Sequence, residues 1–254
     1  MLSKFNNLKI VSNPIVNQSL CTIRDKNTDT QGVRLAARKL TRILLYEATK
    51  HLPQTETEVE TPLCKFTTKT INPDINIIIS PILRAGLIFT DEAVDILPQA
   101  AIRHIGMYRD EKTLKPVWYY NKVPMPVDRP AEDYYVYITD PMLATGNSLI
   151  EAIRLYVEKG IPETNICCVC MISSPQGIEA VFNEFPAITL IVAAVDSHLN
   201  ERGYIVPGMG DAGDRIYNTW YNTIILLHIY IFKIIKTFAS STALSFGSSW
   251  IAFL

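Results

Sequence analysis

The segment that decides the fold is Tyr134–Ser148, YYVYITDPMLATGNS. A short apolar run ends at Asp140, a loop with Thr145 and Gly146 follows, and helical periodicity then begins. Where a strand leads into a helix, the first amides of the helix lack intrahelical partners and can bind a phosphate at the positive end of the helix dipole. The alternative is an ordinary strand-to-helix turn capped by Thr or Ser. The segment contains neither common nucleotide fingerprint, GxxxxGK(S/T) or GxGxxG.

The side chains of this loop suit a phosphorylated sugar. Gly146 has no Cβ, so its backbone can approach phosphate oxygens closely. Thr145 and Ser148 offer hydroxyl donors, whereas ionised Asp140 only accepts hydrogen bonds and therefore suits ribose hydroxyls or a metal-bound water. The segment thus predicts one loop that holds phosphate and ribose together.

Elsewhere the chain alternates apolar strands with amphipathic helices. The predicted strands are Ile75–Ser80, a run that closes at Ile138 and Thr139, Ile166–Ile172 and Ile188–Val195, and the predicted helices cover about 33–44, 149–157 and 176–185. Continuous apolar strands between helices predict an α/β fold, an open parallel sheet with helices on both faces. Ligands bind beyond the carboxyl ends of such strands, and Arg84, Asp140 and Asp196 all follow strand ends. Residues Leu52–Asn72 are rich in Thr, Glu and Pro and are expected to be loop or edge structure.

Four separated motifs carry a resemblance to the uracil phosphoribosyltransferases. DPMLATG (Asp140–Gly146) resembles their phosphoribosyl-pyrophosphate (PRPP) loop, SPILRAGL (Ser80–Leu87) their pyrophosphate loop, GMYRDEKTLKP (Gly106–Pro116) their second arginine segment and GYIVPGMGDAGDR (Gly203–Arg215) their uracil loop. The motifs stand in the family's order, and the resemblance runs from about Asn17 to Tyr217. It implies a phosphoribosyltransferase-type open parallel sheet flanked by helices, with a small hood or arm formed from the N- and C-terminal segments and the 106–127 region.

The resemblance also implies an activity and its residues. The activity is transfer of the phosphoribosyl group of PRPP to N1 of uracil, which gives UMP and diphosphate in pyrimidine salvage. The implied catalytic residues are Arg84, Arg109, Asp140 and Asp211. The implied PRPP-binding residues are Arg84, Arg109, Asp140, Pro141, Met142, Leu143, Ala144, Thr145, Gly146, Asn147, Ser148 and Asp211, and the implied uracil-binding residues are Ile205, Gly210, Asp211 and Ala212. The two arginines suit a diphosphate, because a guanidinium offers a rigid fork of donors to phosphate oxygens.

The uracil loop has a composition that frees its backbone. Four glycines and a proline lie within GYIVPGMGDAGDR, so its amides and carbonyls can point at a ligand. Uracil presents two carbonyl acceptors on either side of an N3–H donor, which alternating N–H and C=O groups from Gly210 to Ala212 can pair. Cytosine would leave buried polar groups unpaired there. Without the other motifs, the same composition would indicate a surface turn.

Two positions depart from the family's pattern. Many phosphoribosyltransferases carry paired acidic residues before the phosphate loop, whereas Thr139 precedes Asp140 here, as in the uracil branch. We therefore expect no metal site built from protein side chains, and Mg2+ held mainly by PRPP and water. Asn147 replaces the usual Gly, a change we expect to be tolerated because Asn adopts left-handed conformations more readily than most residues.

Composition bounds the domain organisation. A chain of 254 residues that is 48% hydrophobic can bury one substantial core. We expect a catalytic domain over residues 1–219 and a hydrophobic, Ser-rich extension over 220–254 outside the catalytic fold. The apolar run Ile224–Phe232 is followed by Lys233 and Lys236, well short of the roughly 20 apolar residues of a membrane span. A membrane anchor is thus the less favoured interpretation of residues 220–254. The alternatives are an amphipathic interface segment and translated non-native sequence.

Charge and cysteines restrict the partners and the compartment. A formal charge of −1 argues against a general nucleic-acid binder. Three of the five cysteines, Cys167, Cys168 and Cys170, lie in an apolar run and are expected to be small buried hydrophobes. The odd number of cysteines suits a reducing compartment, so we expect a cytoplasmic protein, with a plastid or other organelle as the alternative. The four histidines fall in none of the motifs and receive no catalytic role. His198 is expected at the surface.

The resemblance implies that the aromatic arm Gly106–Val127 takes part in subunit packing, so we expect a homodimer or higher homo-oligomer. Some members of the family respond to GTP, which makes GTP a candidate effector. Two rival functions remain open. One is a catalytically weak regulator of the same fold that binds PRPP or nucleotides, and the other is a purine-specific phosphoribosyltransferase. The composition of the uracil loop argues against both.

Overall fold

A single central sheet organises the protein. The computed structural model describes residues 4–109, 116–121, 123 and 129–219. The strands follow the order β1 (Leu8–Ile10), β11 (Thr189–Val195), β10 (Ile166–Ser173), β8 (Tyr134–Thr139), β4 (Asn76–Leu83), β6 (Ile105–Arg109) and β7 (Pro116–Tyr120). Short strands β5 (Ala101–Ile102) and β9 (Met142–Leu143) pair with β4 and β10. Along this order every pairing is parallel except β6 with β7, so the prediction of a mostly parallel α/β sheet is confirmed.

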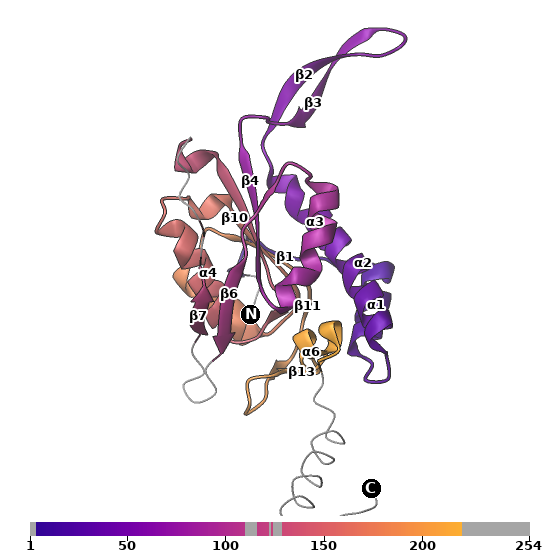
Figure 1. The fold of residues 1–254 in the computed structure, drawn as a ribbon, viewed down its shortest axis with the longest axis vertical. Coiled ribbons are helices and arrows are strands. Elements are labelled where there is room, and N and C mark those ends of the chain that lie inside the picture. Colours follow the sequence, from indigo (N-terminus) through magenta and orange to yellow (C-terminus); the bar gives the residue numbers. More distant parts are fainter. Residues whose placement is uncertain (1–3, 110–115, 122, 124–128, 220–254) are drawn as a thin grey trace, which may run out of the picture. The chain divides into compact units, whose positions relative to one another are not determined.

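Helices cover both faces of the sheet (Figure 1). On one face lie α1 (Pro14–Arg24), α2 (Thr30–Ala48) and α3 (Thr90–Ile96), and on the other lie α4 (Asn147–Val157) and α5 (Pro175–Glu184). The predicted amphipathic helix is α2, whose stripe is buried at Val33, Ala36, Ala37, Leu40 and Leu44. Asp29 caps it by accepting a hydrogen bond from the amide of Gly32 at 2.7 Å.

The central strand β10 connects the two cores. All eight of its residues are buried, and successive side chains point to opposite faces of the sheet. Cys167 and Val169 therefore belong to the core beneath α2, whereas Cys168 and Cys170 belong to the core beneath α4 and α5. This confirms that the three clustered cysteines are buried hydrophobes, and burial raises the pKa of each thiol.

Two hairpins extend from this frame. Instead of the loop or edge structure expected for Leu52–Asn72, β2 (Gln54–Glu60) and β3 (Lys65–Ile71) form a separate antiparallel pair that projects from the sheet (Figure 1). Alternating Thr, Glu and Lys residues support it, since charges of opposite sign face each other across the strands, as Glu60 and Lys65 do. The predicted arm begins as the hairpin β6–β7, while residues 110–115, 122 and 124–128 lie outside the described residues.

The chain after β11 returns toward α1 and α2. It forms the two-stranded sheet of β12 (His198–Leu199) and β13 (Ile205–Val206) and then α6 (Ala212–Tyr217), which packs against α2. Residues up to Tyr217 make one compact unit. The predicted extension 220–254 lies outside the described residues, so a division at residue 219 stays a prediction. Among the described helices, none has the length and apolar composition that crossing a bilayer requires.

Candidate active site

Two neighbouring strands deliver the first predicted site residues to one edge of the sheet. Arg84 directly follows β4 and Asp140 directly follows β8. The two strands pair in parallel with Pro81 opposite Thr139, so their carboxyl ends coincide. Arg84 and Asp140 both line a cavity of about 310 Å³. The expected convergence at the carboxyl edge is therefore present for these two residues.

The loop after Asp140 forms a second, smaller hollow at the start of α4. Gly146 has a φ of 88°, a left-handed conformation that Gly adopts without strain, and the helix begins at the next residue. The hollow has a volume of about 100 Å³ and is lined by Asp140, by residues 142–149 and by Cys170. Asp140, Met142, Ala144 and Ser148 line both this hollow and the larger cavity. An anion held by the first amides of α4 would thus lie beside the larger cavity.

Asp140 is the most strongly perturbed acid of the site. Burial raises the pKa of its carboxyl group to about 7, and the amide of Met142, which donates to Oδ1 at 3.3 Å, opposes part of that rise. Asp140 is only partly exposed, so its ionised carboxylate is stabilised by a hydroxyl donor or cation that enters the cavity. Ribose hydroxyls, the predicted ligands of Asp140, are donors of this kind.

The start of α5 contacts Leu143 and Ala144 of the predicted phosphate loop, Asp140–Gly146, and the sequence did not indicate this contact. The amide of Ser174 donates to the carbonyl oxygen of Leu143 at 2.9 Å, and its hydroxyl donates to that of Ala144 at 2.6 Å. The same hydroxyl oxygen caps α5 by accepting from the amide of Gly177 at 2.9 Å. A Cβ at Gly177 would lie 2.4 Å from the carbonyl oxygen of Ala144, so only Gly permits this close approach.

The remaining members of the predicted PRPP-binding run differ in their surroundings. The carbonyl oxygen of Pro141 accepts from the amides of Met171 and Ile172, each at 3.0 Å, and thus continues the pairing with β10. Leu143 is buried in the core beneath α4. Asn147 is exposed and is the first residue of α4, with right-handed helical backbone. Gly146 makes the left-handed turn, so Asn147 does not need that conformation, and the tolerance of Asn at this position stays a prediction.

The predicted uracil loop faces the larger cavity. Ile205, Gly210, Asp211 and Ala212 all line it, together with Arg84 and Asp140. Gly210 has a φ of 79°, which turns the backbone before α6. Asp211 also caps α6, since its Oδ1 accepts from the amide of Asp214 at 2.9 Å.

Of the two predicted arginines, only Arg84 has a side chain within the described part of the structure. The guanidinium of Arg84 lies 3.4 Å from the Asp214 carboxylate, and its side chain is 57% exposed, which leaves it accessible to an anionic ligand. Arg109 is the last residue of β6, and its side chain lies outside the described part of the structure. Met107, two residues earlier on the same strand, lines the cavity.

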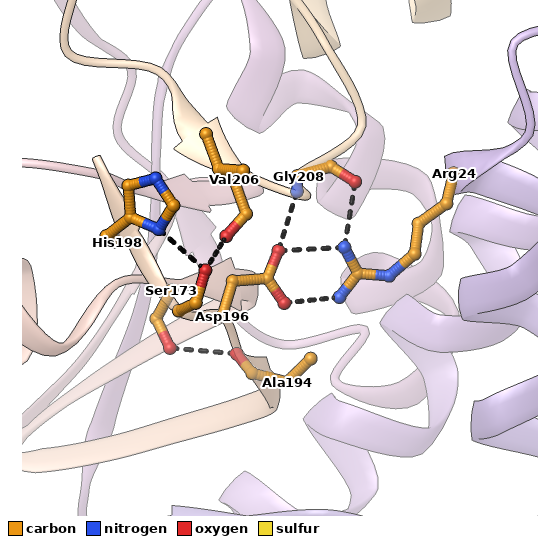
Figure 2. Close-up of polar contacts among 8 residues, drawn as sticks. Arg24, Ser173, Ala194, Asp196, His198, Val206 and Gly208 are labelled. Carbon is orange, nitrogen blue, oxygen red and sulfur yellow. Dashed lines mark hydrogen bonds and ion pairs between the residues drawn. The ribbon is translucent and has the colours of Figure 1, made fainter. Parts of the chain in front are cut away.

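Asp196 also follows a strand end, but its carboxylate is held by protein groups. It forms an ion pair with Arg24, with Nη2 at 2.6 Å from Oδ1, and it accepts a hydrogen bond from the amide of Gly208 at 2.7 Å (Figure 2). The expectation that Asp196 belongs to the ligand-facing group is thus corrected. Arg24 carried no sequence signal, because its partners lie more than 170 residues away along the chain. His198 is exposed, as expected, with Nδ1 at 2.8 Å from the hydroxyl of Ser197.

Comparisons with known proteins agree on one family. The family model for uracil phosphoribosyltransferase matches residues 10–219. The uracil phosphoribosyltransferase of Dictyoglomus thermophilum is 46% identical over 211 residues, which cover 83% of this chain and 98% of that protein. The enzyme of that name from Clostridium botulinum is 43% identical over 209 residues, covering 82% of this chain and 97% of that protein.

A solved structure is similar over most of the chain. The AQ2163 protein from Aquifex aeolicus superposes with a TM-score of 0.76 at 32% sequence identity, covering 85% of this chain and all of that protein. The matched segment contains the hollow at the start of α4, the carboxyl ends of β4 and β8 and the loop before α6. The chain therefore belongs to the uracil phosphoribosyltransferase family.

Proposed function

We propose that this chain transfers the 5-phosphoribosyl group of PRPP to N1 of uracil, giving UMP and diphosphate, with the residues of the described cavity in the roles given below. The reaction is that of a uracil phosphoribosyltransferase, EC 2.4.2.9, the activity that membership of the family carries. The observation that carries the assignment of roles is that Arg84, Asp140 and the backbone of Gly210–Ala212 line one cavity beside the hollow at the start of α4.

The 5-phosphate of PRPP occupies that hollow. The amides at the start of α4 point toward it with the positive end of the helix dipole, and the hydroxyls of Thr145 and Ser148 add donors. Asp140 accepts hydrogen bonds from the ribose hydroxyls, which places the sugar where the hollow joins the larger cavity. Ser174 and Gly177 fix the loop from behind.

Bond cleavage separates two opposite charges that the site stabilises. The bond from C1 to the diphosphate breaks with its electron pair leaving on the diphosphate, and the ribose gains positive charge as N1 of uracil approaches. Arg84 stabilises the departing diphosphate, together with Arg109, whose role rests on the family motif. Ionised Asp140 lies on the side of the positive ribose. The N1 proton leaves to Asp211 or to water.

Magnesium fits the donors of this site. Mg2+ in phosphoryl and diphosphate sites keeps several waters and takes one or two carboxylates together with substrate oxygens. Asp140 and Asp211 both line the cavity, while no group of three or more His, Cys, Asp or Glu side chains that could hold a metal is found among the described residues. PRPP oxygens and water would hold the ion, with these carboxylates nearby, and when bound it neutralises charge on the diphosphate.

Uracil is recognised by backbone groups. Ile205 supplies an apolar wall, and the irregular backbone from Gly210 to Ala212 offers N–H and C=O groups to the edge of the base. Main-chain recognition of this kind distinguishes uracil from cytosine, because the exchanged donor and acceptor of cytosine would remain unpaired in a buried site.

Three further assignments belong to this proposal. All five cysteines are free thiols, which supports a reducing, cytoplasmic setting. Tyr108, Tyr119 and Tyr120 are exposed on the β6–β7 hairpin, and the rings of Tyr108 and Tyr119 stack, which supports a homodimer or larger homo-oligomer. GTP remains a candidate effector through the family alone.

The test mixes the purified chain with PRPP, Mg2+ and labelled uracil and follows UMP, with labelled cytosine in parallel. We expect UMP from uracil and no product from cytosine. A chain that binds PRPP without forming UMP would support the rival assignment, a regulator of the same fold. Product from adenine or hypoxanthine instead would support a purine enzyme.

A further inference from the structure

Arg24 and Asp196 together hold Gly208, a residue of the predicted uracil loop Gly203–Arg215. Nη1 of Arg24 donates to Asp196 Oδ2 and to the carbonyl oxygen of Gly208, each at 2.8 Å, and Nη2 donates to Asp196 Oδ1 at 2.6 Å. The amide of Gly208 donates to Asp196 Oδ2 at 2.7 Å. Both backbone groups of Gly208 are therefore held by one ion pair (Figure 2).

The three residues come from different parts of the fold. Arg24 is the last residue of α1, Asp196 is the first residue after β11, and Gly208 lies two positions before Gly210. The side chains of Arg24 and Asp196 are 24% and 5% exposed, so the pair is largely shielded from water. Because desolvation offsets much of the attraction in such pairs, we expect this pair to add little net stability and to act by fixing geometry.

A second arginine repeats the attachment one residue further along the loop. Arg215 is buried, and it donates to the carbonyl oxygens of Met209 at 2.9 Å, of Asp25 at 2.6 Å and of Ile23. Ile23 and Asp25 flank Arg24 at the end of α1. The carboxyl end of α1 thus holds two consecutive loop residues, Gly208 and Met209, just before the segment that lines the cavity.

We propose that Arg24 and Asp196 are positioning residues for uracil: by holding Gly208 they set where Gly210–Ala212 present their N–H and C=O groups to the base. The inference rests on the proposed function, in which this backbone reads uracil. A side chain can change rotamer to follow a ligand, whereas main-chain donors move only with the loop. A shift of the loop would therefore misplace all of the base-reading groups together, with little effect on the hollow for the phosphate.

The test compares Arg24→Gln, Arg24→Lys and Asp196→Asn with a matched control. Arg154→Gln is the control, because it removes a partly exposed guanidinium that pairs with Glu151 and Glu184 and ties α4 to α5 instead. For the full chain of each variant we would measure the KM of uracil, the KM of PRPP, the cytosine rate, and hydrogen exchange of the amides in 203–212.

We expect Arg24→Gln to raise the KM of uracil by about tenfold or more and to change that of PRPP by less than about twofold, since small misplacements of a binding group have large effects. Amides of 203–212 should exchange faster, and Arg154→Gln should show neither change. Arg24→Lys should restore only part of the affinity, because a single ammonium cannot span Asp196 and the Gly208 carbonyl as the fork does. The double variant of Arg24→Gln with Asp196→Asn should resemble the more affected single variant.

Three results would overturn the positioning role. One is an equal change in the KM of uracil and the KM of PRPP in Arg24→Gln. The others are full recovery of uracil affinity in Arg24→Lys and unchanged hydrogen exchange of the 203–212 amides in Arg24→Gln. Failure of the proposed function is separable, because the unsubstituted chain would then form no UMP. In that case the exchange of 203–212 still decides whether the pair fixes the loop.

Discussion

The hydroxyl of Ser174 donates a 2.6 Å hydrogen bond to the carbonyl oxygen of Ala144 and thereby ties the start of α5 to the phosphate loop. The same oxygen caps α5 through Gly177, so one side chain serves both a helix and the loop that the helix supports.

Replacing Ser174 with Ala should affect binding and stability together. The lost cap should lower the free energy of unfolding by about 1 kcal/mol. The freed loop should raise the KM of PRPP by about fivefold or more. Asp29→Ala is the control, since it removes the cap of α2 and leaves the loop untouched. Equal PRPP affinity in the two variants would show that the Ser174–Ala144 bond does not organise the loop.

Replacing Asp140 with Asn should abolish activity and stabilise the free protein at high pH. The pKa of Asp140 is raised from 3.8 to about 7 on folding, so between these values the folded state binds more protons than the unfolded state. Stability from this residue is therefore highest at low pH and falls as the pH rises through that range. Asn has no charge to bury. Because the side chain is partly exposed, we expect a gain of only about 1–2 kcal/mol at pH 8, vanishing near pH 4.

Thermal unfolding across pH measures this difference. Asp74→Asn is the control, because it removes a carboxylate whose side chain is 84% exposed. If the Asp140→Asn variant were less stable than the unsubstituted chain at pH 8, the carboxylate would have to be well solvated or paired in the free enzyme.

Replacing Arg84 with Gln should lower the rate far more than it lowers stability. Its exposed contact with Asp214 contributes at most about 1 kcal/mol to folding, whereas loss of a guanidinium at a departing diphosphate costs roughly 100-fold or more in kcat. Arg129→Gln is the control, since that exposed arginine contacts Asp74, which precedes the opposite end of β4. Steady-state kinetics together with melting curves test the prediction, and a rate within about threefold of the unsubstituted enzyme would contradict it.

Replacing Asn147 with Gly, the usual family residue, should change little. Asn147 is exposed and helical, so its side chain does not form the turn that Gly146 makes. We expect the KM of PRPP to change by less than about twofold and stability to fall by up to about 1 kcal/mol. A tenfold fall in that KM would instead reveal that the Asn side chain obstructs the phosphate.

What the sequence predicted well was local along the chain. The apolar stripe of α2 and the order of strand, Asp140, loop and helix follow from residue spacing within one or two turns. The hairpin β2–β3 was not predicted, because its strands contain no buried side chains and so lack an alternation of apolar and polar residues. The roles of Ser174, Arg24 and Arg215 were not predicted, because each contacts a partner that is distant in sequence. A buried arginine bound to carbonyl groups also has no local sequence pattern.

The position of β10 between the two cores makes the reactivity of its cysteines a measure of global unfolding. Its thiols at Cys167, Cys168 and Cys170 are buried, whereas Cys21 and Cys64 are exposed. An alkylating reagent should modify the exposed pair at once and reach the other three only when the sheet itself separates from its helices. Counting modified thiols by mass against time would then distinguish loosening of a loop from unfolding of the whole domain, with no label added to the chain.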